Sequence, residues 1–340
     1  MNAEARGSSN DAVPPGTIRH GLTYFTTQVI LDAMSELKVA TSSGRTRVPR
    51  SERWQDRTAV RRQRRAARRY RRAVRWAFAR VSFYREQWAS AGRVLAEPEP
   101  TPVAAVPDPP HALCPFSRPW SGEREPSLWT PTGLPLARVL RAAGCRGRAP
   151  VLEVRESLVD RTRLPRPHRL APPGPAYRVL LSTTAVVASP ERRDELNREA
   201  LAVLGPAGSG WVVAGPDEWA ALPEAADPRL RPVRRLPVAA VADPAAVADP
   251  AATATAGPVV LYEPVLGYLG ALVPACGRFH LDSPRVYARG RDGVVTFSLP
   301  GSRRPVLLEI VPPGADGLSV TTCPRHGTPV LRPRTATITA

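Results

Sequence analysis

Residues 257–281 read GPVVLYEPVLGYLGALVPACGRFHL, and residues 318–332 read LSVTTCPRHGTPVLR. Both belong to the densest run of β-prone residues in the chain, residues 257–332, in which short apolar runs alternate with turn residues. Between the runs at residues 285–289 and 294–299 stands Asp292-Gly293, and an Asp-Gly pair supplies the positive φ angles of a tight hairpin. Residues 306–311, 318–322 and 329–331 are further β-prone pieces. The pattern predicts an antiparallel β meander over residues 257–340.

The same stretch holds two close pairs of cysteine and histidine, Cys276-x-x-x-His280 and Cys323-x-x-His326. Two thiolates and two imidazoles form a normal tetrahedral zinc set, and zinc ligands usually come in such close pairs. A closed four-ligand site leaves no position for a reacting water, so a zinc ion here would be structural. The alternative interpretation is a buried Cys276, an unligated Cys323 and two unrelated surface histidines.

Upstream of the meander, strands and helices alternate. Residues 151–154, 177–181 and 211–214 are strand candidates, and a helix at residues 134–143 is expected to end at Gly144. Ser189-Pro190-Glu191 is typical of a helix start, with a capping hydroxyl, a proline and a first-turn carboxylate. We therefore expect an α/β layer over residues 131–236, followed by an exposed Ala/Pro-rich linker or loop at residues 237–256.

A strongly basic segment precedes this layer. Residues 45–93 contain 17 arginines and only three acidic residues, a local charge of +14 in a chain whose net charge is +18. We predict a helix from Arg57 to Trp88, because apolar residues recur three, four or seven positions apart. Its arginines are either a solvated outer face or a basic face, between Arg61 and Arg75, for nucleic acid, an acidic partner or anionic lipid. The apolar positions are Val60, Ala67, Tyr70, Val74, Ala77, Val81, Tyr84 and Trp88.

The length and composition of the chain limit its possible domain organisation and location. Its 340 residues suffice for one large core or two ordinary cores. We expect residues 1–50 to be a flexible N-terminal region, residues 51–95 the basic helix and residues 96–130 a Pro-rich connection. The sequence has no run long enough to span a bilayer, no secretory signal pattern, and four cysteines that are too scattered for a disulfide framework. These features predict a cytoplasmic protein.

Several motifs resemble those of one enzyme group. Residues 80–86 read RVSFYRE and, with Ala91-Gly92, are similar to the N-terminal Ser-x-Phe-Tyr-Arg-Glu segment of phenylacetate–CoA ligase-like adenylate-forming enzymes. That group includes synthetases that adenylylate a deazaflavin coenzyme. Tyr262 stands where the Tyr-Gly-x-Thr-Glu signature belongs, and Cys276 and His280 stand where such enzymes carry a Cys followed by Gly-x-His. Residues 286–287 and 293–299 match strands that lead to the nucleotide-ribose motif, and residues 182–195 fit the segment upstream.

This resemblance implies a fold, a chemistry and a set of ligand-binding residues. The fold would be a reduced adenylate-forming-like core, and the activity a carboxylate-activating, AMP-forming ligation that uses ATP with Mg²⁺ and a small carboxylate substrate. Tyr262 and Glu263 would lie at the nucleotide, and Asp316 is the nearby carboxylate that could replace the ribose-binding Asp. Some relatives look similar at the Cys/His pairs, where a structural metal ties the hairpin region together.

The sequence departs from the family pattern where the chemistry needs it most. Activating a carboxylate requires donors and cations arranged around a transferring phosphoryl group. No Ser/Thr/Gly-rich phosphate loop occurs between residues 93 and 177, and no lysine follows Lys38, whereas the family's C-terminal domain carries a catalytic lysine. Alignment on Tyr262 puts Glu263 at the Gly, Val265 at the Thr and Leu266 at the Glu of the signature. Valine and leucine can neither hydrogen-bond adenine nor hold Mg²⁺.

The expected Arg-Tyr-x-x-Gly-Asp ribose motif after Pro305 is replaced by Leu308-Glu309-Ile310. The sequence thus supports two functional hypotheses. The first is a divergent member of the phenylacetate–CoA ligase-like group that lacks full ligase activity. The second is a non-catalytic binding protein whose arginine-rich helix engages nucleic acid or an acidic partner.

Overall fold

A computed structural model gives the fold of residues 50–92, 98–107, 110–117, 134–156, 168–170, 174–185, 187, 189–205, 208–242 and 257–334. The chain divides into two compact units, residues 1–52 and 53–340, and the described elements lie in the second unit, apart from the first three residues of a helix that begins at Arg50. Residues 1–49 of the N-terminal region predicted to be flexible, and residues 243–256 of the predicted linker, lie outside the described residues, whereas residue 50 begins a helix.

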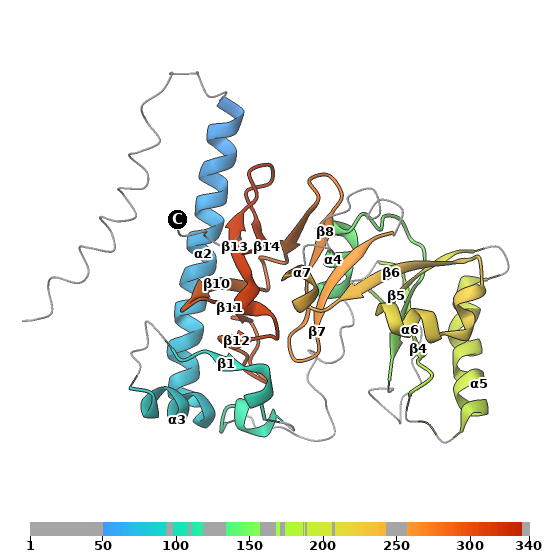
Figure 1. Cartoon of the computed structure of the whole chain (residues 1–340), viewed down its shortest axis with the longest axis horizontal. Coiled ribbons are helices and arrows are strands. Elements are labelled where there is room, and N and C mark those ends of the chain that lie inside the picture. Colours follow the sequence, from blue (N-terminus) through green and yellow to red (C-terminus); the bar gives the residue numbers. More distant parts are fainter. Residues whose placement is uncertain are drawn as a thin grey trace, which may run out of the picture. The chain divides into compact units, whose positions relative to one another are not determined.

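A ten-stranded mixed sheet forms the centre of this unit (Figure 1). Its parallel part has the order β4-β2-β5-β6-β7, with β3 antiparallel at the edge. Its antiparallel part continues from β7 through β8, β9, β14 and β13. The strands are β2 (Val151–Arg155), β3 (His168–Arg169), β4 (Ala176–Leu181), β5 (Gly210–Ala214), β6 (Leu230–Leu236), β7 (Val259–Glu263), β8 (Gly267–Val273), β9 (Arg278–Leu281), β13 (Leu318–Thr322) and β14 (Pro329–Pro333).

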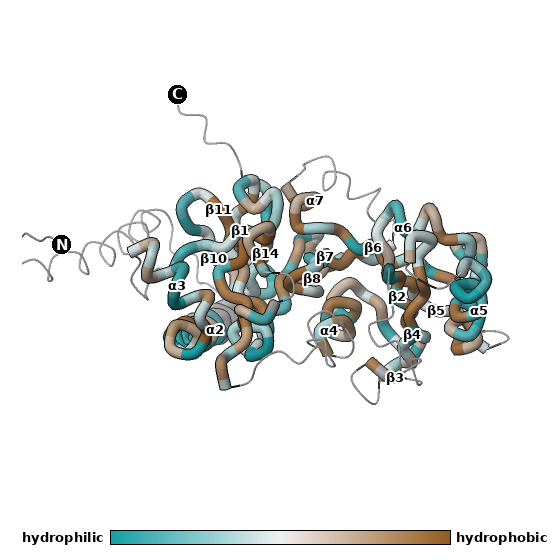
Figure 2. The backbone as a smooth tube through the Cα atoms, turned by 90° about the horizontal axis from the view of Figure 1, so that it is seen from below, coloured by the Kyte–Doolittle hydropathy of each residue, from teal (hydrophilic) through white to brown (hydrophobic). Residues whose placement is uncertain are grey.

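Helices cover both faces of the parallel part, so the α/β fold class is confirmed. On one face, α4 (Leu134–Ala142) packs Leu136, Val139 and Leu140 against the strands. On the other face, α5 (Pro190–Leu201) and α6 (Pro216–Ala221) contribute to a second apolar cluster. Figure 2 shows α4 and α6 on opposite sides of the strands. The predicted helix start is confirmed, because the Ser189 hydroxyl accepts a hydrogen bond from the backbone N–H of Arg192 (3.2 Å). The parallel strands have the order 2-1-3-4-5, which is the order of one type of doubly wound sheet.

The predicted meander is divided between two sheets, which corrects the single meander expected from the sequence. The hairpin β10 (Tyr287–Arg291) and β11 (Val294–Ser298) turns at Asp292-Gly293, where both φ angles are positive as predicted. It leaves the large sheet and forms a four-stranded sheet with β12 (Ile310–Val311) and β1 (Thr101–Pro102). The predicted strand at residues 306–311 is therefore limited to its last two residues.

The basic segment forms two helices, α2 (Arg50–Arg80) and α3 (Ser82–Ser90), where the sequence predicts one. Val81 is extended (φ −121°, ψ 117°), and the guanidinium of Arg85 donates hydrogen bonds to the carbonyls of Phe78 and Ala79 at the end of α2. These bonds satisfy carbonyls that a continuous helix would have used internally. The break also turns Tyr84 into the core, where it is fully buried.

The apolar stripe of the basic segment is docked on the protein. Six of its eight predicted positions are buried, Ala67 is half-buried, and Val60 is 46% exposed, which corrects its expected place in the stripe. The buried positions join one core with residues of β7, β11 and the stretch 306–310. The arginines from residue 61 to residue 80 are all exposed: Arg61, Arg62, Arg64, Arg65, Arg68, Arg69, Arg71, Arg72, Arg75 and Arg80.

The start of the predicted linker belongs to the core, which corrects its expected exposure. Val238 and Val241 are fully buried, the second within α7 (Ala239–Ala242). A Cβ atom at Gly314, whose φ is +72°, would stand 2.8 Å from the Cα atom of Ala239, so this close approach requires glycine. The short 3₁₀ helices are η2 (Val103–Ala105), η3 (Pro110–Leu113), η4 (Ala202–Leu204), η5 (Pro223–Ala226) and η6 (Ala315–Gly317). Among the described residues, no helix is both long and apolar enough to cross a membrane.

Candidate functional site

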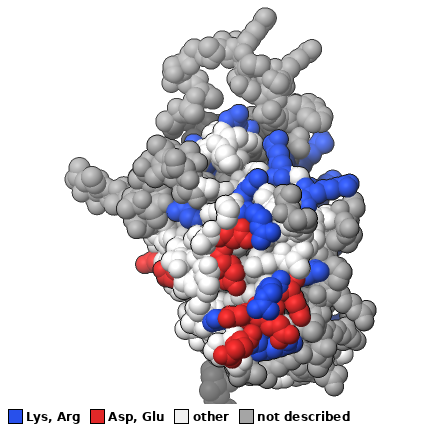
Figure 3. Space-filling model, turned by 90° about the vertical axis from the view of Figure 1, so that its right-hand side faces the viewer, with Lys and Arg blue, Asp and Glu red and all other residues white. Residues whose placement is uncertain are grey.

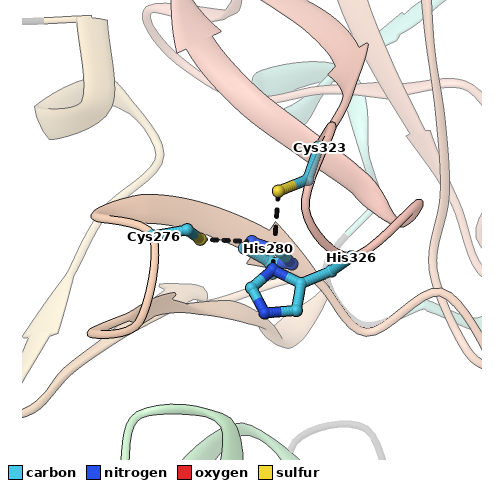
Figure 4. A group of neighbouring side chains, drawn as sticks. All are labelled: Cys276, His280, Cys323 and His326. Atoms are coloured by element: carbon cyan, nitrogen blue, oxygen red, sulfur yellow. Dashed lines mark hydrogen bonds between the residues drawn. The ribbon is translucent and has the colours of Figure 1, made fainter. Parts of the chain in front are cut away.

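Two neighbouring hairpin turns bring the four predicted metal ligands together (Figure 4). Cys276 lies in the turn between β8 and β9, and His280 lies on β9. Cys323 and His326 lie in the turn between β13 and β14. The two cysteine–histidine pairs are 43 residues apart in the sequence. They lie next to each other in the structure because β9 pairs with β14, with His280 opposite Val330.

Each turn has the same local construction. The N–H groups of Cys276 and Gly277 both donate to the carbonyl of Val273, and the N–H of Gly327 donates to the carbonyl of Cys323. Gly277 and Gly327 both have a φ of +60°. This left-handed conformation costs glycine little, and it reverses the chain directly beside a ligand residue. The Cys-Gly and His-Gly pairs in the sequence therefore determine where the ligands face.

The four ligand atoms fit a tetrahedral metal. They all lie within 4.8 Å of one another. The Cys276 Sγ and His280 Nε2 atoms are 3.0 Å apart, and the Cys323 Sγ and His326 Nδ1 atoms are 3.5 Å apart. Zinc–sulfur and zinc–nitrogen bonds at tetrahedral angles separate neighbouring ligands by roughly 3.3–3.8 Å. The cluster could therefore hold a metal such as zinc after only small movements of the side chains.

The surroundings prepare these side chains for a divalent cation. Burial, followed by the charge of the neighbouring His326, lowers the pKa of His280 to about 4, so its imidazole is neutral as a metal ligand must be. Burial acts in the opposite direction at Cys276: it raises the pKa of the thiol, whereas a metal ligand is a thiolate, so metal binding there must release a proton. His280 Nδ1 hydrogen-bonds with Thr328 Oγ1 (2.7 Å), which fixes the ring and directs Nε2 towards the cluster.

The residues implied by the family resemblance do not form one cluster. Tyr262 is half-buried at the end of β7, with the guanidinium of Arg235 4.8 Å from the centre of its ring and with Arg155 near its hydroxyl. Glu263 is only 5% exposed, and burial raises its pKa to about 7. Asp316 is exposed on η6, which neighbours β11 and α7. The structure thus places Tyr262 beside charged groups and Asp316 on a different part of the surface.

A buried charged network beside Tyr262 was not predicted. Glu153 is fully buried on β2 and accepts hydrogen bonds from the hydroxyls of Tyr177 (2.5 Å) and Tyr268 (2.9 Å). Arg235 lies 3.5 Å from Glu153 and is held by Glu218 at 2.5 Å. The signal in the sequence was a carboxylate inside the apolar run Val-Leu-Glu-Val, since a charge there must find partners when it is buried.

Comparison with protein-family models and with curated proteins finds no match to this chain. The resemblance to phenylacetate–CoA ligase-like enzymes therefore stays a prediction that rests on the motifs quoted above.

Proposed function

We propose that this chain is a divergent member of the phenylacetate–CoA ligase-like adenylate-forming group, which binds a nucleotide or a small carboxylate without completing the ligase reaction. The observation that carries this proposal is the position of Tyr262. In doubly wound sheets, ligands bind outside the carboxyl ends of the strands, near the point where the strand order reverses. That reversal lies between β2 and β5, and Arg155 stands at the carboxyl end of β2. Arg235 and Tyr262 stand near the carboxyl ends of β6 and β7, one and two strands beyond β5, and the Tyr262 hydroxyl lies near Arg155.

The chemistry of these side chains suits an anionic ligand with a flat ring. Guanidinium groups bind phosphate and carboxylate oxygens through paired N–H donors. The half-buried ring of Tyr262 offers an apolar surface for a base or an aryl group. Glu218 and Glu153 hold the Arg235 guanidinium from two sides, and it lies 4.8 Å from the centre of the Tyr262 ring, so its role is to fix the position of that ring.

The surroundings of Val265 and Leu266 support the absence of full ligase activity. Leu266 is fully buried in the apolar core, and Val265 packs against the same core. These are the positions where the family signature has Thr and Glu. Oxygen ligands for Mg²⁺ are therefore replaced by core side chains.

Calorimetric titration of the full chain with ATP, AMP and phenylacetate, with and without Mg²⁺, tests the proposal. We expect binding that Tyr262→Ala and Arg155→Gln weaken. The matched control is Arg231→Gln, which removes an exposed arginine near the opposite end of β6. We also expect no ATP–pyrophosphate exchange with aromatic or fatty carboxylates. Robust exchange would refute the lack of full ligase activity. Failure to bind either nucleotide or carboxylate would refute the ligand site at Tyr262.

A second candidate function rests on α2. Its stripe from Tyr70 to Ala77 is buried, while its arginines from Arg61 to Arg80 are exposed, so this part of α2 presents a dense row of cations on a fixed helix. The face on the α5 side of the protein differs, because acidic and basic side chains are interspersed there (Figure 3). Nucleic acid is the partner that such a row fits best, since its phosphates repeat along the strand.

Salt dependence tests this second candidate. If α2 binds nucleic acid through Z phosphate contacts, the logarithm of the affinity falls with that of salt concentration with a slope of about −0.9Z for duplex DNA. Replacing Arg64, Arg68 and Arg72 by Gln removes three exposed charges spaced one turn apart, and it should reduce affinity and slope. The control replaces Arg192 and Arg198 on α5. If the α2 and α5 substitutions reduce the affinity equally, or if the protein does not bind nucleic acid at low salt, the arginines of α2 are only a solvated surface.

We further propose that the Cys276, His280, Cys323 and His326 cluster holds structural zinc. The fit of the four ligand atoms supports this, and a bound zinc would tie the β8–β9 turn to the β13–β14 turn. Elemental analysis of protein purified without a histidine tag should give about one zinc per chain. Cys276→Ser should abolish it, and Cys145→Ser, which changes a thiol outside the cluster, should retain it. Metal-free protein with an unchanged melting temperature would refute the assignment.

A further inference from the structure

A cavity of about 460 Å³ opens beneath the end of α4. Its walls come from α4, from the loop that follows it, from the segment before β4, and from the amino ends of β2 and β5. Leu140, Val151 and Leu170 contribute apolar side chains that belong to the α4 core cluster, and Trp211 adds an aromatic ring. The volume lies in the range of small-molecule sites.

The charges at this cavity have one sign. Arg141 on α4 and Arg146 in the following loop both line it, and both are exposed to solvent. No aspartate or glutamate stands among its described lining residues. Cys145 also lines it, but burial raises the pKa of this thiol to about 12, so the cavity gains no negative charge from it at neutral pH. The combination is an apolar floor with a cationic rim.

We propose that this cavity binds a small amphipathic anion, with its apolar ring against Trp211 and Leu140 and its anionic group at Arg141 and Arg146. Burial of the ligand's ring against the apolar walls contributes binding free energy but does not fix the orientation of the ligand. The guanidinium groups fix that orientation through charge-assisted hydrogen bonds. The site is distinct from the one proposed at Tyr262. Val151 and Arg155 begin and end β2, and four residues of strand put roughly 13 Å between the two ends.

The probe for this site is 2-naphthoate, an aromatic ring with one carboxylate, titrated into the full chain by calorimetry. Arg141→Gln and Arg146→Gln should each weaken binding about tenfold, the equivalent of one charge-assisted hydrogen bond. The matched control is Arg148→Gln, because Arg148 is an exposed arginine of the same loop that does not line the cavity. The uncharged analogue naphthalene-2-carboxamide should bind more weakly than 2-naphthoate to the unmodified chain.

A second variant tests the cavity without changing charge. Ala137→Phe places a ring into it from α4 and should abolish binding, with far-UV circular dichroism as the check that the fold is kept. Should this variant unfold, the exposed arginine variants still decide the question. Three results would overturn the inference: no binding of 2-naphthoate, equal affinity in Arg141→Gln and Arg148→Gln, or a loss of affinity in Tyr262→Ala that the arginine variants do not share. The last would place the probe at the carboxyl ends of the strands.

Discussion

Glu309 is the carboxylate on which the docking of the small sheet most depends. It is fully buried and has a positive φ of 55°. Its Oε2 atom accepts hydrogen bonds from Arg289 Nη2 (2.8 Å), Arg289 Nε (3.2 Å) and Thr296 Oγ1 (3.1 Å), and its Oε1 atom accepts one from Ser298 Oγ (3.2 Å). The Arg289 guanidinium also lies 5.0 Å from the centre of the Tyr70 ring on α2. One carboxylate thus links β10, β11 and α2.

Glu309→Gln tests this role with little change in shape. The amide carries no charge to pair with that of Arg289, and its NH₂ group must replace one of the two oxygens that accept hydrogen bonds from Arg289, Thr296 and Ser298. Leaving one member of a buried ion pair without its partner costs about 3–5 kcal/mol. Because the Arg289 side chain is 23% exposed, water recovers part of its solvation. We therefore expect a loss of about 2–3 kcal/mol in the free energy of unfolding.

Urea unfolding at equilibrium measures this loss, and a double-mutant cycle with Arg289→Met isolates the pair. The double variant should lose clearly less than the sum of the two single variants, since it leaves no unpaired charge. The control is Glu195→Gln, which breaks an exposed pair with Arg192 on α5 and should cost less than about 0.5 kcal/mol. A Glu309→Gln cost as small as the control, or strict additivity in the cycle, would refute the reasoning.

Three further substitutions each test the surroundings of one side chain. Tyr84→Phe should lose about 2 kcal/mol in urea unfolding, because the Tyr84 hydroxyl donates to the Val306 carbonyl (3.0 Å) and accepts from the Leu308 N–H (2.9 Å) inside the core; an unchanged midpoint would contradict this. Glu263→Gln should stabilise the protein increasingly between pH 4.5 and 7. The folded state keeps the Glu263 proton up to a pKa of about 7, whereas the unfolded state releases it near 4.5, so the native protein loses stability as pH rises through that window. The gain should approach about 3 kcal/mol at pH 8, and a pH-independent difference between the two proteins would exclude the buried carboxyl as its source. Thr328→Val should lower zinc affinity about 10- to 100-fold in chelator competition by releasing His280 Nδ1, and retention of full affinity would show that the hydrogen bond does not position the ring.

Local patterns in the sequence determined most of the secondary structure. The Ser189-Pro190 helix start, the Asp292-Gly293 hairpin and the apolar stripe of α2 depend on neighbours within a few residues, so their physical causes are visible in the chain itself. The cysteine–histidine pairs were visible for the same reason. Their spacing indicated the ligand set, and the turns at Gly277 and Gly327 fix the local geometry.

Contacts between distant segments were decided only by the tertiary structure. Whether the two ligand pairs meet depends on β9 pairing with β14, a register set by the sheet as a whole. The partners of Glu153 come from β4, β6 and β8, and those of Glu309 from β10 and β11; in the sequence each carboxylate is merely a charge inside an apolar run. The helix break at Val81 likewise follows from the place that Tyr84 takes in the core. The periodicity of a sequence shows which face of a helix or strand is apolar. A charged side chain, however, can be buried only where folding brings it partners from distant segments, and the sequence pattern does not show those partners.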